Sequence, residues 1–265
     1  MEVLIQRDEE TADLLVALLI AEALRKKPDL VLGLATGRTM EPVYAHLVRM
    51  HTEEGLNFSA CRTFNLDEYI GLTVENPNSY HYFMNEHLFS RVNIKLKNTH
   101  VPDGVAEDLD GECQRYEESM RECGGIDLQL LGIGRSGHIG FNEPLSALRS
   151  RTRCKALTPV TIEQNSPLFD DPDEMPKRAI TMGVGTILDA KRCLLLVTGA
   201  EKAEILHRAV EGPVTSMISA SALQWHERCT AIVDQAAAAE LEGREYYQWI
   251  WEHEPEWREF REQLA

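Results

Sequence analysis

Short apolar runs alternate with amphipathic stretches along most of this chain, and this alternation limits its fold more than any other feature. The apolar runs that we expect to be strands are residues 3–5, 30–34, 61–66, 126–131, 193–197 and 230–233. The stretches that we expect to be helices are residues 8–27, 41–54, 78–89, 109–123 and 203–211. Continuously apolar strands separated by helices are typical of a parallel sheet covered on both faces. The sequence therefore predicts a three-layer α/β fold with a mostly parallel, doubly wound (Rossmann-like) sheet.

Two segments depart from this alternation. Residues 150–176 are polar and contain four prolines, which favours either a mobile lid, extending over residues 150–182, or a solvated excursion. From about residue 240 aromatic residues are mixed with Glu and Arg, which predicts an amphipathic C-terminal helix that packs on the domain or on a neighbouring subunit. We therefore expect one domain over residues 1–240 and a C-terminal amphipathic segment over residues 241–265.

The composition narrows the choice of partners and compartment. A net charge of −16 disfavours binding to nucleic acid and to anionic membranes. The six cysteines form no C-x-x-C pair and no His cluster has zinc spacing, so we expect free thiols and no metal site. The N-terminus lacks the pattern of a signal peptide and no apolar run is long enough to span a bilayer. We therefore expect a cytoplasmic protein.

Two turns that follow predicted strands have the residues of an anion site. The first contains Thr36, Gly37, Arg38 and Thr39 just before a helix, whose N-terminus favours an anion. The second carries Lys202 at a similar helix start, where the macrodipole disfavours a cation unless an anion is bound. An ordinary turn and a solvated lysine are the alternatives, and both stay open from these residues alone.

Two further strand ends carry groups that can transfer protons. Asp67 and Glu68 follow an apolar run, where Asp67 could be a general base and Glu68 its partner, unless both lie in an exposed acidic loop. His138 lies in a loop with four glycines, and Glu143 five residues later could fix its tautomer. Together with the anion turns, these groups favour proton transfer next to the carbonyl of a phosphorylated metabolite.

Seven motifs of this chain resemble those of the glucosamine-6-phosphate deaminase family. The resemblance runs from about residue 3 to residue 234, and its order and spacing are far more specific than any single motif. The motifs are LGLATG (32–37), NLDEYIGL (65–72), NPNSY (76–80), GHIGFNEP (137–144), SRTR (150–153), TMGVGTIL (181–188) and GAEK (199–202).

This resemblance implies conversion of glucosamine 6-phosphate and water to fructose 6-phosphate and ammonia, without a metal ion or organic cofactor. It implies that His138, supported by Glu143, opens the sugar ring and that Asp67, beside Glu68, moves a proton between C2 and C1. It further implies that Thr36, Gly37, Thr39 and Lys202 hold the phosphate and that residues 150–182 form a lid. The assignment of these residues to the phosphate and of residues 150–182 to a lid follows from the family resemblance and not from the residues alone.

The chain departs from the family pattern at four positions. Ser136 stands where the family has Asp or Asn two residues before the histidine, and it carries no charge to tune His138. Pro167 stands where the lid normally supplies an Arg to the phosphate, while Arg38 and Met40 replace a small residue and a Pro in the first turn. We hypothesise that Arg38 takes over from the missing lid Arg.

Some family members are hexamers activated by N-acetylglucosamine 6-phosphate. Ser146, Arg153 and Lys155 match part of that allosteric pocket, while the C-terminal aromatic segment has no clear counterpart. We therefore expect a homo-oligomer and hold allosteric activation as a weaker hypothesis.

Three other functions stay open. The same chemistry on galactosamine 6-phosphate differs only in the configuration of the sugar at C4. A 6-phosphogluconolactonase of the related fold would not need the NLDEY element. A sugar-phosphate sensor without catalysis would not need Asp67 and His138.

Overall fold

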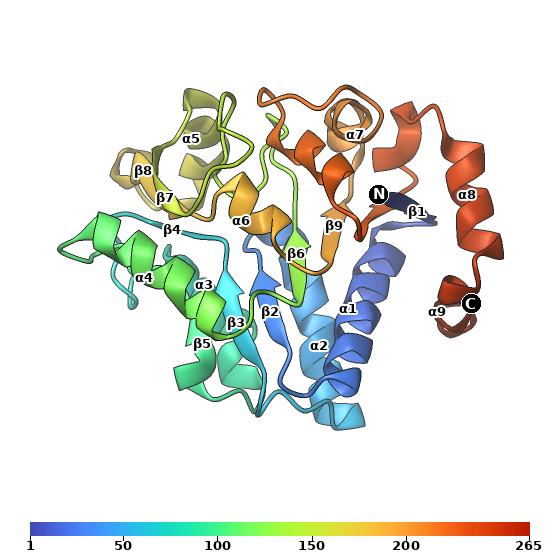
Figure 1. The fold of residues 1–265 in the computed structure, drawn as a ribbon, viewed down its shortest axis with the longest axis horizontal. Coiled ribbons are helices and arrows are strands. Elements are labelled where there is room, and N and C mark those ends of the chain that lie inside the picture. Colours follow the sequence, from blue (N-terminus) through green and yellow to red (C-terminus); the bar gives the residue numbers. More distant parts are fainter.

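The computed structural model describes all 265 residues and is built around a seven-stranded sheet (Figure 1). The strand order is β1-β10-β9-β6-β2-β3-β5, and every neighbouring pair is parallel. The strands are β1 (Glu2–Gln6), β2 (Val31–Leu34), β3 (Arg62–Asn65), β5 (Thr99–His100), β6 (Leu128–Leu131), β9 (Cys193–Val197) and β10 (Cys229–Asp234). The parallel α/β sheet predicted from the sequence is therefore confirmed.

Helices lie on both sides of this sheet (Figure 1). The α-helices up to the last strand are α1 (Glu9–Lys26), α2 (Glu41–Glu54), α3 (Tyr80–His87), α4 (Leu109–Glu122), α5 (Pro159–Asn165), α6 (Val184–Leu188) and α7 (Ala203–Val210). Short 3-10 turns complete the connections: η1 (Arg38–Met40), η2 (Phe89–Arg91), η3 (Leu96–Asn98), η4 (Ser166–Leu168), η5 (Pro172–Glu174), η6 (Ala200–Lys202), η7 (Ser219–Trp225) and η8 (Ala237–Glu240). The five helices predicted from periodicity are confirmed to within about two residues at each end.

Local chemistry explains where these helices begin. Asp8 is the N-cap of α1, and its Oδ1 accepts the Thr11 N–H at 2.8 Å. Acidic residues occupy the first turn of α1 and basic residues its last turn, which complements the helix macrodipole. Helix α2 begins with Glu41 and Pro42, and Pro is favoured there because the first N–H groups have no acceptor within the helix. The start of α2 in turn fixes the direction of the turn that follows β2.

The central strands are buried on both faces, which explains their continuous apolar sequence. All residues of β2, β6, β9 and β10 are buried. On one face Phe64 of β3 packs edge-on against Tyr116 of α4, with 5.7 Å between ring centroids. Replacing a fully buried residue here, for example Leu32→Ala, would cost about 2–5 kcal/mol of stability.

A second, smaller sheet lies above the first and was not predicted. Its strands are β4 (Asp67–Tyr69), β8 (Arg178–Thr181) and β7 (Arg153–Ala156), in the order β4-β8-β7 with antiparallel pairing. Residues 150–182 therefore contain two strands and helix α5 and are more ordered than a solvated excursion. The side chains that close this layer form their own apolar cluster: Tyr69, Phe141, Leu157, Phe169, Met175 and Ala179.

The prediction of a single C-terminal helix is wrong. Two helices, α8 (Arg244–His253) and α9 (Arg258–Leu264), are separated by the 3-10 turn η9 (Pro255–Trp257), because Pro255 cannot continue a helix. Trp257 is fully buried in the main core, with the Arg192 guanidinium 5.7 Å from the centre of its ring. This segment therefore packs on the domain, which is one of the two alternatives predicted from the sequence. None of the helices combines the length and apolar character of a bilayer span.

Candidate active site

Three turns at the carboxyl ends of adjacent strands β9, β6 and β2 meet at one edge of the sheet. The Lys202 Nζ, after β9, donates to the Ile133 carbonyl after β6 at 3.0 Å. A Cβ placed on Gly132 would lie only 3.1 Å from the Met40 methyl, which follows β2. This is the edge at which open α/β sheets bind their ligands.

The turn after β2 leads directly into a helix start and carries an unpartnered cationic side chain. Gly37 has φ 111°, a conformation that favours glycine, and it directs the chain into η1 and α2. Thr36 and Thr39 are half-buried beside it. Arg38 is exposed and makes no hydrogen bond or ion pair within the chain, so its guanidinium is available to a ligand.

The turn after β9 places Lys202 beside the loop that carries the histidine. Burial lowers the pKa of Lys202, and its hydrogen bond to Ile133 uses only one of three donors. Gly199 has φ 91°, and its N–H is shared between the two carboxylate oxygens of Asp234 at 3.2 and 3.3 Å. The Gly199 N–H is therefore already bonded to Asp234, whereas the Lys202 ammonium still has donors for a phosphate.

His138 lies between two partners that both face its Nδ1. The Ser136 Oγ is 2.8 Å from Nδ1, and the Glu143 Oε2 is 3.3 Å from it. A Cβ on Gly134 would lie 2.1 Å from the His138 Nε2, so only glycine allows the ring to lie against this loop. The glycine density of the loop, noted in the sequence, thus has a specific steric cause.

Glu143 is buried and ionised beside the imidazole. Its Oε1 accepts the Thr161 hydroxyl at 2.5 Å and the Thr158 N–H at 3.2 Å. Burial acts to raise its pKa, but the close approach of His138 and the two donors at Oε1 hold the pKa of Glu143 at about 2. A fixed negative charge at Nδ1 stabilises an imidazolium and favours the Nδ1–H tautomer, leaving Nε2 to exchange protons.

Asp67 lies on the same side as the histidine loop. A Cβ on Gly140, two residues after His138, would lie 3.4 Å from the Asp67 Oδ2. Asp67 is 6% exposed, and burial, reinforced by the charge of Glu68, raises its pKa to about 8. A carboxylate with a raised pKa is a stronger base, and the structure thus brings the two proton-transfer groups predicted from the sequence together.

Glu68, next to Asp67, accepts three backbone hydrogen bonds. Its carboxylate accepts the N–H groups of Tyr69 at 2.8 Å, Tyr80 at 3.0 Å and His81 at 2.9 Å, and so it anchors the start of α3. Burial raises its pKa to about 7, against the effect of these three donors. The Oε1 of Glu68 accepts two of these hydrogen bonds and Oε2 accepts one, so one acceptor site on Oε2 remains for a ligand.

Sequence reasoning missed the residues that join the lid to the site. The Tyr69 hydroxyl receives hydrogen bonds from Asn165 of α5 at 3.0 Å and from the Tyr80 hydroxyl at 3.3 Å. Tyr69 and Tyr80 lie within the family motifs, which marked the positions but not the contact. No pattern in the sequence identified Asn165 or Thr161 as neighbours of the site.

Two of the three residues matched to the allosteric pocket contact each other. Arg153 donates to the Ser146 Oγ at 3.1 Å and to the Asn142 Oδ1 at 2.8 Å. Arg153 has no carboxylate partner, and burial lowers its pKa. Lys155 lies two residues further along β7, half-buried.

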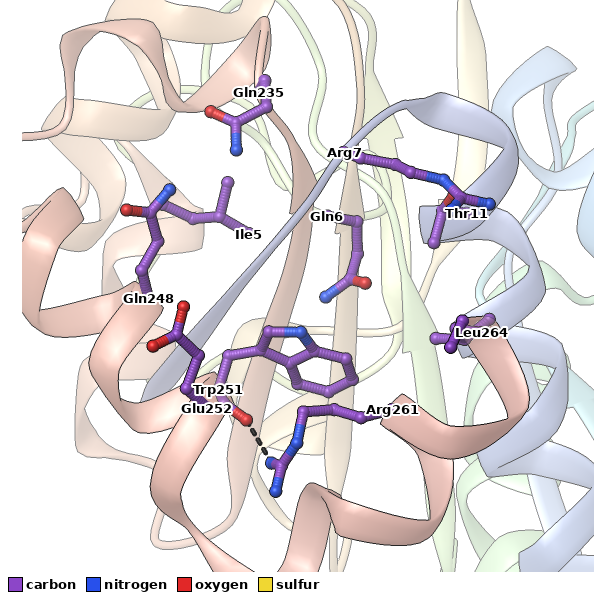
Figure 2. Close-up of a pocket in the computed structure, with 11 residues that line it drawn as sticks. Ile5, Gln6, Arg7, Thr11, Gln235, Gln248, Trp251, Glu252, Arg261 and Leu264 are labelled. Atoms are coloured by element: carbon purple, nitrogen blue, oxygen red, sulfur yellow. Dashed lines mark hydrogen bonds between the residues drawn. The ribbon is translucent and has the colours of Figure 1, made fainter.

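A separate pocket of about 390 Å³ lies beside β1, the outer strand of the main sheet (Figure 2). It is enclosed by β1, α1 and the two C-terminal helices, with Gln6, Trp251 and Arg261 pointing toward one another. None of the residues proposed above lines this pocket. No group of three or more His, Cys, Asp or Glu side chains is arranged to hold a metal ion.

The parallel sheet, the anion turns and the paired acid–base groups at its carboxyl edge define an α/β enzyme of proton-transfer chemistry. The sequence model of the family described as glucosamine-6-phosphate isomerases/6-phosphogluconolactonase matches residues 8–232. The chain belongs to this family.

Relatives within the family share much of the sequence. The glucosamine-6-phosphate deaminase of Shewanella loihica is 48% identical over 250 residues, covering 94% of this chain and 93% of that protein. The one of Hahella chejuensis is 50% identical over 227 residues, 86% of this chain and 87% of that protein.

Solved structures agree with this assignment. A protein described as a monomeric glucosamine-6-phosphate deaminase superposes with a TM-score of 0.89 at 44% identity, over 91% of this chain and 100% of that chain. A 6-phosphogluconolactonase from Thermotoga maritima reaches a TM-score of 0.68 at 21% identity, over 88% of this chain and 99% of that one, so it shares the fold alone.

Proposed function

We propose that this enzyme converts glucosamine 6-phosphate and water into fructose 6-phosphate and ammonia. The observation that carries the proposal is the buried position of Asp67, whose Oδ2 is 3.4 Å from where a Cβ on Gly140 would lie. Gly140 is part of the loop that carries His138. A base and a titratable imidazole that face one space are what an aldose–ketose isomerisation needs. The identity of 45–50% to deaminases across most of the chain supports the same reaction.

His138 opens the pyranose ring in the first step. Its Nε2 takes the proton of the C1 hydroxyl and returns a proton to the ring oxygen as the C1–O5 bond breaks. Glu143 holds the Nδ1 side and stabilises the imidazolium while it carries that proton. Ser136 adds a hydrogen bond at the same nitrogen but no charge.

Asp67 performs the second step. Its carboxylate removes the C2 proton of the open-chain sugar while the C1 oxygen takes up a proton, which gives an enolamine. A proton is then delivered to C1 and the amine loses one, so that an imine forms at C2. Water then adds to this imine and ammonia leaves, which gives the ketose. The raised pKa of Asp67 makes its carboxylate basic enough for a carbon acid.

Thr36, Gly37, Arg38, Thr39 and Lys202 hold the phosphate in this proposal. Arg38 is exposed without a partner, and Lys202 has two free donors at the neighbouring turn. Pro167 lies in η4 and supplies no charge from the lid. Arg38 therefore takes the place of the lid Arg of the family.

The remaining expectations stay part of the proposal. Residues 150–182 act as a lid over the site. They belong to a single domain over residues 1–240, which is followed by the C-terminal segment 241–265. All six cysteines are free thiols, which suits the cytoplasm.

The proposed homo-oligomer would use α8, whose exposed Tyr246 and Trp249 leave an aromatic face for a second copy. Light scattering tests this oligomeric state.

Allosteric control through Ser146, Arg153 and Lys155 is a further part of the proposal. The two contacts of Arg153 link the beginning of β7 to the loop after His138, so an anion bound there would act on that loop. Rate curves that change from sigmoidal to hyperbolic with N-acetylglucosamine 6-phosphate would support it. Hyperbolic curves that ignore this compound would contradict it.

A coupled assay for ammonia tests the reaction itself. Purified enzyme is supplied with glucosamine 6-phosphate or galactosamine 6-phosphate, and kcat/KM is compared. We expect release of ammonia with a clear preference for the gluco epimer. Preference for the galacto epimer would reassign the substrate, and tight binding without ammonia would indicate a sensor.

A further inference from the structure

Helix α5 of the lid contacts the buried carboxylate behind the histidine. The Thr161 Oγ1 donates to the Glu143 Oε1 at 2.5 Å, and the Thr158 N–H donates to the same oxygen at 3.2 Å. Thr161 is 1% exposed and Glu143 is 2% exposed. Both groups are therefore shielded from water, and a hydrogen bond between them is costly to lose.

The other oxygen of this carboxylate has no such constraint. The Glu143 Oε2 is buried, faces the His138 Nδ1 at 3.3 Å and has no hydrogen-bond partner of good geometry. Among the largest influences on the ionisation of Glu143, His138 is the one titratable side chain. The direction in which Oε2 points is therefore set by the two lid donors at Oε1.

The Thr161 hydroxyl is not needed to start its own helix. Thr158 is the N-cap of α5, and its Oγ1 accepts the Thr161 N–H at 3.3 Å. A Val at position 161 would keep this N–H and the apolar contacts of the side chain. The Thr158 hydroxyl also donates to the Thr161 Oγ1 at 3.2 Å, so the Thr161 hydroxyl links the N-cap of α5 to Glu143, and the proton of that hydroxyl is directed at Glu143.

The same helix contacts the other half of the site at its last residue. Asn165 donates to the Tyr69 hydroxyl at 3.0 Å, two residues after Asp67. Helix α5 thus spans from the carboxylate behind the imidazole to the strand that carries the base. A displacement of α5 would break contacts at both ends.

We infer that Thr161 is a positioning residue that couples the lid to catalysis, because its hydroxyl orients Glu143 toward the His138 Nδ1. This inference rests on the proposed function for its kinetic consequence, but not for its effect on the imidazole. With α5 in place, Glu143 selects the Nδ1–H tautomer and leaves Nε2 free to accept the sugar proton. Without the hydroxyl, the carboxylate rotates and the tautomer is no longer fixed.

Three variants test this in the full-length enzyme. Thr161→Val removes the hydroxyl at constant shape, Thr161→Ala removes it without a methyl beside the carboxylate, and Thr161→Ser restores it. Thr186→Val is the matched control, because Thr186 donates an equally short hydrogen bond of 2.5 Å to the Oε1 of the half-buried Glu117, away from the site. Any general cost of losing such a bond appears in the control as well.

We expect kcat for ammonia release to fall about tenfold in Thr161→Val and Thr161→Ala, with KM within about twofold of wild type. Thr161→Ser and Thr186→Val should stay within about twofold of wild-type kcat. If Thr161→Val does not fold, the kcat of Thr161→Ala tests the inference in its place. A wild-type kcat in the hydroxyl-free variants would overturn the inference, as would an equal loss in Thr186→Val.

The imidazole itself provides a readout that does not depend on turnover. In protein labelled with ¹⁵N-histidine, the His138 signals are assigned by their loss in His138→Gln. We expect the Nδ1–H tautomer in wild type and Thr161→Ser, and a tautomer mixture in Thr161→Val and Thr161→Ala. Unchanged nitrogen shifts contradict the coupling, while a wild type that releases no ammonia contradicts only the proposed function.

Discussion

Asp67 lies directly opposite Thr181 in the antiparallel pairing of β4 with β8. The Thr181 Oγ1 accepts the Phe141 N–H at 3.0 Å, so one residue of the lid sheet touches both the strand of the base and the histidine loop. The proposed base, the proposed ring-opening group and the lid are therefore held by one small layer above the main sheet.

The activity should depend on the ionisation of Asp67. Burial and the charge of Glu68 raise the pKa of Asp67 to about 8, and a base works only when deprotonated. We therefore expect kcat/KM to rise as the pH increases through about 8 and to level off above it. A profile that is flat between about pH 6 and 9 would contradict the assignment of this pKa to the working base.

Arg38 should carry part of the binding of the phosphate. Loss of an uncompensated charge contact of this kind costs roughly 2–5 kcal/mol, so Arg38→Ala should raise KM at least about tenfold with little change in kcat. Arg91→Ala, an exposed Arg in η2, is the control. An unchanged KM in Arg38→Ala would show that this residue does not replace the lid Arg.

Ser136 should tune His138 only modestly. Ser136→Ala removes the 2.8 Å contact with Nδ1, and we expect kcat to fall by about threefold to tenfold at constant KM. Ser136→Asp restores the charged residue of the family and should equal or exceed wild-type kcat. Steady-state kinetics of the pair decides, and a loss in Ser136→Asp larger than in Ser136→Ala would speak against this role.

Asp13 should make the protein less stable at high pH. It is 2% exposed and its Oδ1 has no partner, and burial together with the charges of Glu9 and Asp234 raises its pKa to about 7. Because the folded pKa exceeds the unfolded one, the contribution is favourable below about pH 4 and is lost as the pH rises through about 7.

Asp13→Asn should therefore stabilise the fold at pH 8 by about 1–3 kcal/mol and much less at pH 5. Thermal unfolding at both pH values measures this difference. Asp29→Asn, at an exposed position in the turn after α1, is the control and should leave the stability unchanged at both pH values. An Asp13→Asn variant that is destabilised at pH 8 would show that the buried carboxylate has a partner in solution.

Much of the main sheet and of the helices around it could be predicted from the sequence, because the strands are continuous apolar runs and the helices have clear ends. Asp8 and Pro42 mark the starts of α1 and α2 in the sequence and occupy those positions in the structure. The second sheet was missed because its strands have three or four residues each, and β7 has no fully buried residue. The break at Pro255 was visible, but the aromatic content on both sides suggested one helix.

The positions of the site were predictable but their contacts were not. Asp67, His138 and Glu143 follow strands, and the parallel topology brings those strand ends to one edge. The use of Glu68 by the start of α3, and of Glu143 by α5, depends on where residues 12 to 18 positions away fold back. Such contacts leave no periodic pattern, so neither the hydrogen bonds of Glu68 to the start of α3 nor the contact of Thr161 with Glu143 was predicted.

The most direct test of the account compares wild type with Asp67→Asn on glucosamine 6-phosphate, with ammonia release for turnover and titration calorimetry for binding. We expect the variant to bind the sugar phosphate with nearly wild-type affinity and to release ammonia about a thousandfold more slowly, or less. Turnover at the wild-type rate in Asp67→Asn would show that another group moves the proton from C2 to C1.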